Sequence, residues 1–230
     1  YDKRVVYATY DVTDYFSTGS NAFGILLGNG WDSLPTRDVF GMHDANWHTP
    51  PKVRLNVVVE YESGARDVIV TDRTWKWGHG EIVYNSVRSG ETIDHTKSVH
   101  GWNEPGFCDS LWRNVCHVPA PLGKLTADPM PPMRVAKELK PVGITETGPG
   151  VYLVDFGENL TGWVETRVRG SRGQTVELQF NEVLKADGSL NTQNSTWHTR
   201  GRYQTELLIL GGDGEETFEP RFTYHGFRYM

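Results

Sequence analysis

The chain has 230 residues, enough to bury the core of one large domain or of two ordinary ones. With 25 Gly, 12 Pro and 12% aromatic residues, its composition is typical of a β protein with glycine turns. The formal net charge is −6 and no segment concentrates Lys and Arg, which argues against nucleic acid or an anionic membrane surface as a partner. The longest apolar run, near Gly24–Leu27, is too short to cross a bilayer.

The N-terminal half predicts short strands around one long polar loop. Its expected strands are Arg4–Val12, Asn21–Leu27, Lys52–Tyr61, Arg66–Thr71, Glu81–Val87 and Ser89–Thr96. Lys52–Tyr61 alternates cleanly, with Val53, Leu55, Val57 and Val59 on one face, and a turn at Glu62–Gly64 leads into the hairpin partner. The polar stretch Trp31–Pro51 is longer than an ordinary connection, and loops of that length usually carry function or are mobile.

The C-terminal half predicts a second β block behind a strand-poor segment. Trp102–Pro132 is rich in Pro, Gly, Asp and Trp, with at most one helical turn near Asp109–Val115. The expected strands that follow are Arg134–Leu139, Val151–Asp155, Trp163–Arg169, Gln174–Glu182, Tyr203–Leu210 and Glu216–Tyr224. In Gln174–Glu182, the residues Val176, Leu178 and Phe180 share the inward face.

Turns recur about every ten residues along this second block, which is typical of an antiparallel sandwich. The sequence therefore predicts an all-β protein with two antiparallel β-sandwich domains in tandem. We expect one domain over 1–113, a linker over 114–132 and a second domain over 133–230. Both ends of the chain lie in strand-like segments, so we expect them to be cuts within a larger protein.

Two carboxylates at close spacing are the first requirement of glycoside hydrolysis. Glu91 and Asp94, in Gly90–Asp94, form the tightest polar constellation among the 29 acidic residues. The alternative is a strand-end turn in which these carboxylates cap backbone amides. With 29 acidic residues to choose from, the sequence assigns no catalytic residue.

The long polar loop also carries metal-ligand types and two tryptophans. His43, Asp44, Asn46 and His48 fall together, but their spacing matches no compact Ca²⁺ loop, so a solvated loop is favoured and no metal ligand is assigned. Trp31 and Trp47 lie in loop context and are candidates for stacking on a sugar ring. Trp75 and Trp77 alternate along a strand, which predicts one in the core and one at the surface.

The two cysteines, Cys108 and Cys116, are close enough to pair if the segment between them folds back. Two free, half-buried thiols are the equal alternative.

Several short motifs along nearly the whole chain resemble glycoside hydrolase family 78, the α-L-rhamnosidases. The N-terminal motifs are Tyr1–Tyr7, Thr9–Thr13, Gly19–Ala22, Leu26–Trp31, Trp75–Trp77, Gly90–Asp94 and Gly101–Trp102. The C-terminal motifs are Lys140–Pro141, Asp155–Trp163, Glu182–Leu184, Asp187–Gly188 and Glu219–Tyr229. Each piece is short, and it is their shared order that carries the resemblance.

The resemblance implies that the first block is the family's N-terminal jelly-roll domain, truncated at its N-terminus, and that the second is the family's next β-sandwich. The family's catalytic carboxylates lie in a separate α/α-barrel that begins after the HGFRY segment, here His225–Tyr229. It implies an inverting glycosidase as the parent protein, and a chain that is inactive alone. The expected partners are that barrel, in the same polypeptide, and a rhamnose-containing carbohydrate.

In some family members the jelly roll binds rhamnose with Ca²⁺, so Ca²⁺ is the one cofactor that the resemblance suggests. For sugar binding we expect Asn29, Trp31, Trp47, Glu91 and Asp94 to meet at one end of a sandwich. A free-standing carbohydrate-binding module, without a hydrolase partner in the chain, is the alternative. A periplasmic or secreted location is favoured.

Overall fold

The computed structural model describes residues 2–194 and 199–230 and shows an all-β protein. Every helix among these residues is a single three-residue 3₁₀ turn: η1 (Thr13–Tyr15), η2 (Met42–Asp44), η3 (His95–Lys97) and η4 (Thr192–Asn194). Most strand pairs are antiparallel. The predicted all-β class with antiparallel sheets is confirmed.

The chain divides into two compact units, and each unit is assembled from three separate stretches of sequence. Unit 1 contains 1–25, 53–78 and 101–138, and unit 2 contains 26–52, 79–100 and 139–230. The segment 79–100 thus belongs to the same unit as the C-terminal third of the chain. The division into domains 1–113 and 133–230 with a linker between them stays a prediction.

Unit 1 consists of three strand pairs. β1 (Arg4–Tyr7) pairs in parallel with β8 (Lys124–Ala127), and β4 (Lys76–Trp77) pairs antiparallel with β7 (Arg113–Asn114). β2 (Asn56–Glu60) and β3 (Arg66–Val70) form the predicted hairpin, whose turn has Gly64 at φ +82°. Val57 of β2 is buried, whereas Val58 is exposed, as the alternation predicts.

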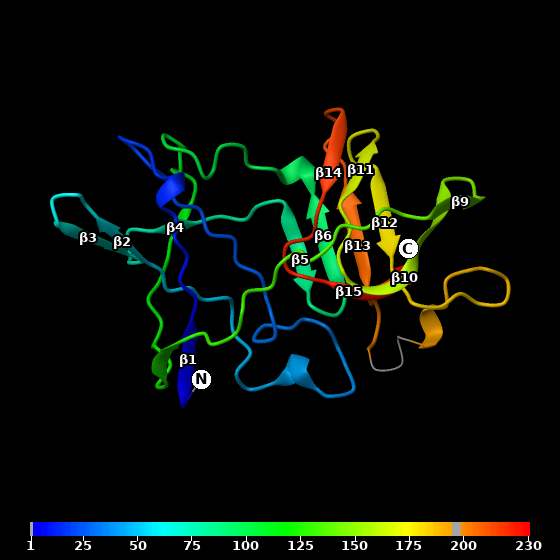
Figure 1. Ribbon diagram of the computed structural model, residues 1–230, viewed down its shortest axis with the longest axis horizontal. Coiled ribbons are helices and arrows are strands. Elements are labelled where there is room, and N and C mark those ends of the chain that lie inside the picture. The colour runs from blue at the N-terminus through cyan, green and yellow to red at the C-terminus, as the bar shows by residue number, and fades with distance from the viewer. Residues whose placement is uncertain (1, 195–198) are drawn as a thin grey trace. The chain divides into compact units, whose positions relative to one another are not determined.

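Unit 2 contains the larger sheets (Figure 1). In the four-stranded sheet the order is β12 (Thr175–Gln179), β13 (Thr205–Ile209), β6 (Gly90–Asp94) and β5 (Ile82–Ser86), with β13 and β6 parallel. In the three-stranded sheet the order is β15 (His225–Tyr229), β10 (Val151–Gly162) and β9 (Gly143–Gly148). β11 (Thr166–Arg169) pairs with β14 (Glu215–Phe218).

The hydrophobic core of unit 2 lies between these sheets. The four-stranded sheet contributes Ile93, Leu178 and Leu208, and the three-stranded sheet contributes Val154, Phe156 and Phe227. Leu178 and Phe180 are buried while Glu177 and Gln179 are exposed, so the predicted alternation over Gln174–Glu182 is confirmed. Facing sheets that share one core make this part of the chain a β-sandwich.

The turn between β5 and β6 requires a glycine at its end. Gly90 has φ +100°, and a Cβ at that position would overlap the backbone carbonyl of Thr205 at the start of β13. Only glycine allows both this conformation and this close approach of two backbones. The turn residues Val87–Ser89 are thereby held beside the segment that leads into β13.

Some predicted elements are wrong. Asn21–Leu27 and Arg134–Leu139 are not strands, because neither finds a neighbouring strand to bond. The predicted strand Glu216–Tyr224 ends at Phe218, ahead of Pro220, and β15 begins only at His225. The segment Asp109–Val115 contains one tight turn, from Asp109 to Trp112, ahead of β7 and no helix, in agreement with the expectation of at most one helical turn.

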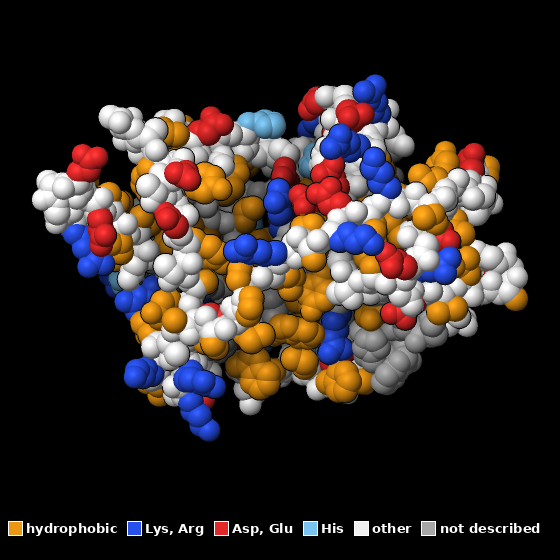
Figure 2. All heavy atoms as spheres, in the orientation of Figure 1, with side chains coloured by type: hydrophobic (Ala, Val, Ile, Leu, Met, Phe, Trp, Pro, Cys, Tyr) orange, Lys and Arg blue, Asp and Glu red, His pale blue; other side chains and the backbone are white. Residues whose placement is uncertain are grey.

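The surface of the described residues carries many hydrophobic side chains, which are visible on the face drawn in Figure 2. Cys108 and Cys116 are both free and exposed, so they are neither paired nor half-buried. Trp75 is half-buried and Trp77 is 40% exposed, so the prediction that one of them lies in the core is wrong. Within the described residues, none of the helices has the length and hydrophobicity of a membrane span.

Candidate functional site

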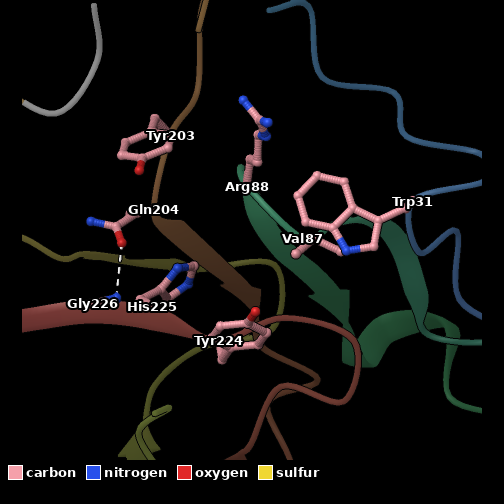
Figure 3. A pocket seen from close by; sticks show the side chains of 8 residues that line it. All are labelled: Trp31, Val87, Arg88, Tyr203, Gln204, Tyr224, His225 and Gly226. Carbon is pink, nitrogen blue, oxygen red and sulfur yellow. Dashed lines mark hydrogen bonds between the residues drawn. The ribbon is translucent and has the colours of Figure 1, made fainter. Parts of the chain in front are cut away.

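A pocket of about 200 Å³ opens on unit 2 where four segments meet (Figure 3). Trp31 comes from the long polar loop and Arg88 from the β5–β6 turn. Tyr203 and Gln204 lead into β13, while Tyr224 and His225 stand at the start of β15. The residues that line it include three aromatic rings and no Asp or Glu.

The loop that carries Trp31 is anchored to the sheet. The backbone N–H of Asn29 donates to Oδ1 of Asn85 at 2.7 Å, and the side-chain amide of Asn29 donates to the carbonyl of the same residue at 2.8 Å. Further along, Leu34 is fully buried and the Thr36 hydroxyl lies 2.6 Å from that of Ser89. The polar loop is therefore fixed at several points, which holds Trp31 beside the pocket.

Arg88 is held by an aromatic and ionic cluster. Its guanidinium lies 5.4 Å from the ring centre of Trp31 and 5.3 Å from that of Phe40. It also approaches the buried carboxylate of Asp38 at 3.3 Å. The positive charge beside the pocket is thus matched by a neighbouring negative charge.

His225 is fixed at the pocket wall by two contacts. Its Nε2 lies 2.5 Å from Oε1 of Glu206, and its ring stacks on Phe180 with centres 4.8 Å apart. The side chain is 1% exposed, and its Nδ1 has no hydrogen-bond partner among the described residues. A buried polar atom without a partner is unusual in a folded protein and calls for an explanation.

The structure places Glu91 inside the four-stranded sheet and away from solvent. Its side chain is fully buried and accepts hydrogen bonds from the backbone N–H groups of Arg221 at 3.2 Å and Phe222 at 3.0 Å. Burial raises the pKa of Glu91 to about 7, although these backbone hydrogen bonds oppose the shift. Glu91 therefore ties β6 to the segment ahead of β15.

Asp94 caps the 3₁₀ turn that follows β6. Its carboxylate accepts a hydrogen bond from the backbone N–H of Thr96 at 3.1 Å and pairs with Lys97 at 3.0 Å. Hydrogen bonding from the Thr96 hydroxyl lowers the pKa of Asp94. Gly90–Asp94 is a strand rather than a turn, and both of its carboxylates bind backbone amides, as the capping alternative expects.

We expect Asp94→Ala to lower the free energy of unfolding by about 1 kcal/mol, because an unreplaced cap leaves a backbone N–H without a partner. Asp94→Asn is the control, because its amide oxygen still caps the turn. The ion pair that it loses involves the exposed Lys97 and contributes little to the free energy of unfolding. Urea denaturation measures both. Equal losses in the two variants would contradict a capping role.

Trp47 and the metal-ligand types of the polar loop lie apart from this pocket. Trp47 is 59% exposed. Asp38, His43 and Asp44 line a second hollow of about 500 Å³ together with Arg37 and Arg200. The described residues bring no group of three His, Cys, Asp or Glu side chains into a metal-binding arrangement. Of the two loop tryptophans, Trp31 lines the pocket and Trp47 does not.

Sequence reasoning missed most of the pocket. It singled out Trp31, but Arg88, Tyr203 and Gln204 carry no local signal. Tyr224 and His225 lie inside the terminal motif Glu219–Tyr229, which carries the family resemblance but no signal of a pocket. Because these residues come from segments up to about 190 positions apart, only the folded sheet brings them together.

These features define an all-β region with an aromatic pocket and no carboxylate at its wall. The pattern of the α-L-rhamnosidase N-terminal domain matches residues 1–137, and that of the bacterial α-L-rhamnosidase concanavalin-like domain matches residues 145–230. The chain therefore belongs to the α-L-rhamnosidase family.

Three α-L-rhamnosidases are similar to this chain over nearly its whole length. A solved α-L-rhamnosidase from Dictyoglumus thermophilum is 41% identical, with a TM-score of 0.86, over 99% of this chain and 24% of that one. The Streptomyces avermitilis α-L-rhamnosidase, solved in complex with L-rhamnose, is 38% identical, with a TM-score of 0.86, over 100% of this chain and 22% of that one. An α-L-rhamnosidase of Formosa agariphila is 33% identical over 100% of this chain and 24% of its own length. The chain spans less than a quarter of each of these relatives.

Proposed function

We propose that this chain is the accessory β region of an α-L-rhamnosidase, an inverting enzyme that removes terminal α-L-rhamnosyl residues from glycosides or polysaccharides. The observation that carries the proposal is the pair of family matches, which together cover nearly the whole chain. The relatives that match it are about four times longer, which leaves room for a catalytic α/α-barrel in the same polypeptide.

The chemistry of the described residues supports an accessory role. Glycoside hydrolysis needs two carboxyl groups at the substrate, one of them as a proton donor. Glu91 has the raised pKa of a proton donor, but it is fully buried and bonded to backbone amides. The pocket around Trp31 has no carboxylate in its wall. In this proposal the chain supports the catalytic barrel, and the acid–base pair that hydrolyses the substrate lies in the barrel.

We expect the isolated 230-residue chain to release no detectable product from an aryl α-L-rhamnoside, because it presents no accessible acid–base pair. The longer protein that contains this chain is the positive control and should hydrolyse the same substrate. Absorbance of the released phenol measures both. Turnover by the isolated chain that disappears in Glu91→Gln would place the active site here and refute the proposal.

A free-standing carbohydrate-binding module is the second candidate, favoured by the exposed aromatic side chains of Trp31 and Trp47. Of the five residues expected to bind sugar, Trp31 lines the pocket and Asn29 anchors its loop, while Glu91 and Asp94 are engaged in internal hydrogen bonds. The coding sequence downstream distinguishes the candidates. Helix-period repeats with paired acidic residues support the enzyme, and a stop codon near Met230 supports the module.

A further inference from the structure

We propose that one aromatic surface of unit 2 is the site at which the catalytic domain of the same polypeptide docks. This surface, the Arg88 patch, consists of Arg88 and the exposed side chains around it: Trp31, Val39, Phe40 and Tyr224. The inference rests on the proposed function, which places a catalytic domain in the longer protein. It deepens that function by assigning the contact surface on this chain.

Exposed aromatic side chains of unit 2 converge on the patch. Trp31 and Phe40 are 48% and 64% exposed, and the guanidinium of Arg88 lies 5.4 Å and 5.3 Å from their ring centres. Tyr224 is 40% exposed and lines the same pocket as Trp31 and Arg88. Tryptophan, tyrosine and arginine are the residue types that dominate the binding energy of protein interfaces. The patch therefore has the composition of an interface centre.

The backbone that carries Val39 and Phe40 is held in place. The buried carboxylate of Asp38 lies 3.3 Å from Arg88 and accepts a hydrogen bond from the backbone N–H of Phe40 at 2.9 Å. Asp38 also forms a backbone bridge with Thr199, ahead of β13. Two apolar side chains, 61% and 64% exposed, thus stand on a fixed loop. A surface that is already ordered loses little conformational entropy when a partner docks on it.

The pocket in the patch suits one side chain of the partner. Its volume of about 200 Å³ lies below the ~300–1,000 Å³ typical of pockets for drug-sized ligands. Figure 3 shows Trp31, Tyr203 and Tyr224 on different sides of the hollow. None of the described residues that line it is Asp or Glu, and the charge of Arg88 is matched by Asp38. An aliphatic or aromatic side chain would fill the pocket without leaving a charge unpaired.

The charges around the patch argue against a second copy of this chain as the occupant. The adjoining hollow is lined by Val39 and by four charged residues: Arg37, Arg200, Asp38 and Asp44. With Arg88 included, the arginines outnumber the carboxylates by three to two. A two-fold dimer through the patch would set these positive rims against each other. The rim instead fits a partner that carries carboxylates around an apolar centre.

The length of the relatives favours an occupant in the same polypeptide. This chain covers 22–24% of the relatives that it matches, so most of a protein of that length lies outside these 230 residues. A domain on the same chain meets the patch at an effective concentration of about millimolar. The contact can therefore be smaller and weaker than one that holds a separate protein.

Hydroxyl-radical footprinting of the longer protein tests the inference, because the oxidation rate of a side chain follows its exposure to water. Two pairs of the same residue type serve as internal controls. Trp31 is 48% exposed in this chain and Trp47, outside the patch, is 59% exposed; Tyr224 is 40% exposed and Tyr152 is 56% exposed. In the longer protein, Trp31 and Tyr224 should be oxidised at least about fivefold more slowly than their controls, since an interface centre excludes water.

Variants of the longer protein show whether the patch itself holds the partner. Val39→Asp places a charge at an apolar contact, and Phe40→Ala removes the most exposed ring of the patch. Each should raise the oxidation rate of Tyr224 at least about threefold. Ile144→Asp is the matched control for Val39→Asp, because Ile144 is 65% exposed on β9, outside the patch. It should leave the rate within about twofold. Circular dichroism establishes that each variant is folded, and the comparison within the unmodified protein needs no variant.

A photoreactive benzoylphenylalanine in place of Phe40 identifies the occupant. It keeps an aromatic ring at this exposed position. On irradiation of the longer protein, it should cross-link to a peptide of the catalytic domain. The same group in place of Tyr152 should give no such cross-link.

Three outcomes overturn the inference: Trp31 and Tyr224 as reactive as their controls in the longer protein, a Tyr224 rate unchanged in both Val39→Asp and Phe40→Ala, or cross-links that join two copies of the protein. Failure of the proposed function shows separately, as a longer protein that does not hydrolyse rhamnosides. An active protein with an exposed patch refutes only the docking surface. An inactive protein with a protected patch refutes only the enzyme.

Discussion

Phe227→Ala is expected to lower the free energy of unfolding by about 3–5 kcal/mol, the range for removing a fully buried phenylalanine. Phe227 is 1% exposed. Its ring meets Phe156 edge-on at 5.4 Å between centres and contacts Phe180 at 4.9 Å. These rings link the three-stranded sheet to the segment that follows β12, so a cavity here opens the middle of the sandwich. Urea denaturation followed by tryptophan fluorescence measures the loss.

Phe40→Ala is the matched control, because it removes the same side chain from a position that is 64% exposed. We expect it to cost less than about 1 kcal/mol. Similar losses in the two variants would mean that Phe227 does not lie in the core.

Stability of the chain should fall between about pH 4.5 and pH 7 through Glu91. Its folded-state pKa of about 7 lies above its ordinary value of 4.5, because burial penalises the carboxylate. The folded state therefore holds the proton more tightly than the unfolded state does. The stabilisation is complete below about pH 4.5 and is lost as pH rises to about 7. At about 1.4 kcal/mol per pH unit, this amounts to about 3 kcal/mol.

Glu91→Gln removes the titration and keeps an amide oxygen for the backbone N–H groups of Arg221 and Phe222. Its unfolding free energy should vary about 3 kcal/mol less than that of the unmodified chain over the same pH range. Asp94 and Glu216 have lowered pKa values, by hydrogen bonding, and act in the opposite direction, but they are common to both proteins and cancel in the difference. Glu62→Gln, in an exposed turn, is the control. A pH dependence that is equal in all three chains would show that Glu91 titrates normally.

Local sequence was sufficient where a structure depends on neighbours in the chain. The hairpin of β2 and β3 follows from alternating valines around a glycine turn, and a turn of this kind pairs strands that are already adjacent. The inward face of β12 follows in the same way, since the side chains of a strand alternate whatever strand lies beside it. The family resemblance rested on motif order, which is also a property of the sequence alone.

Tertiary structure decided everything that depends on distant partners. The parallel pairing of β6 with β13 brings Glu91 beside Glu206 across 115 positions, and no local pattern encodes that neighbour. The same pairing turns Gly90–Asp94 from a plausible surface turn into a buried strand, because a β ladder on both sides removes it from solvent. Trp31 was visible in the sequence, but its place beside Tyr224 and His225 was not. Side chains converge on a pocket through sheet order, and sheet order is set by the packing of the whole core.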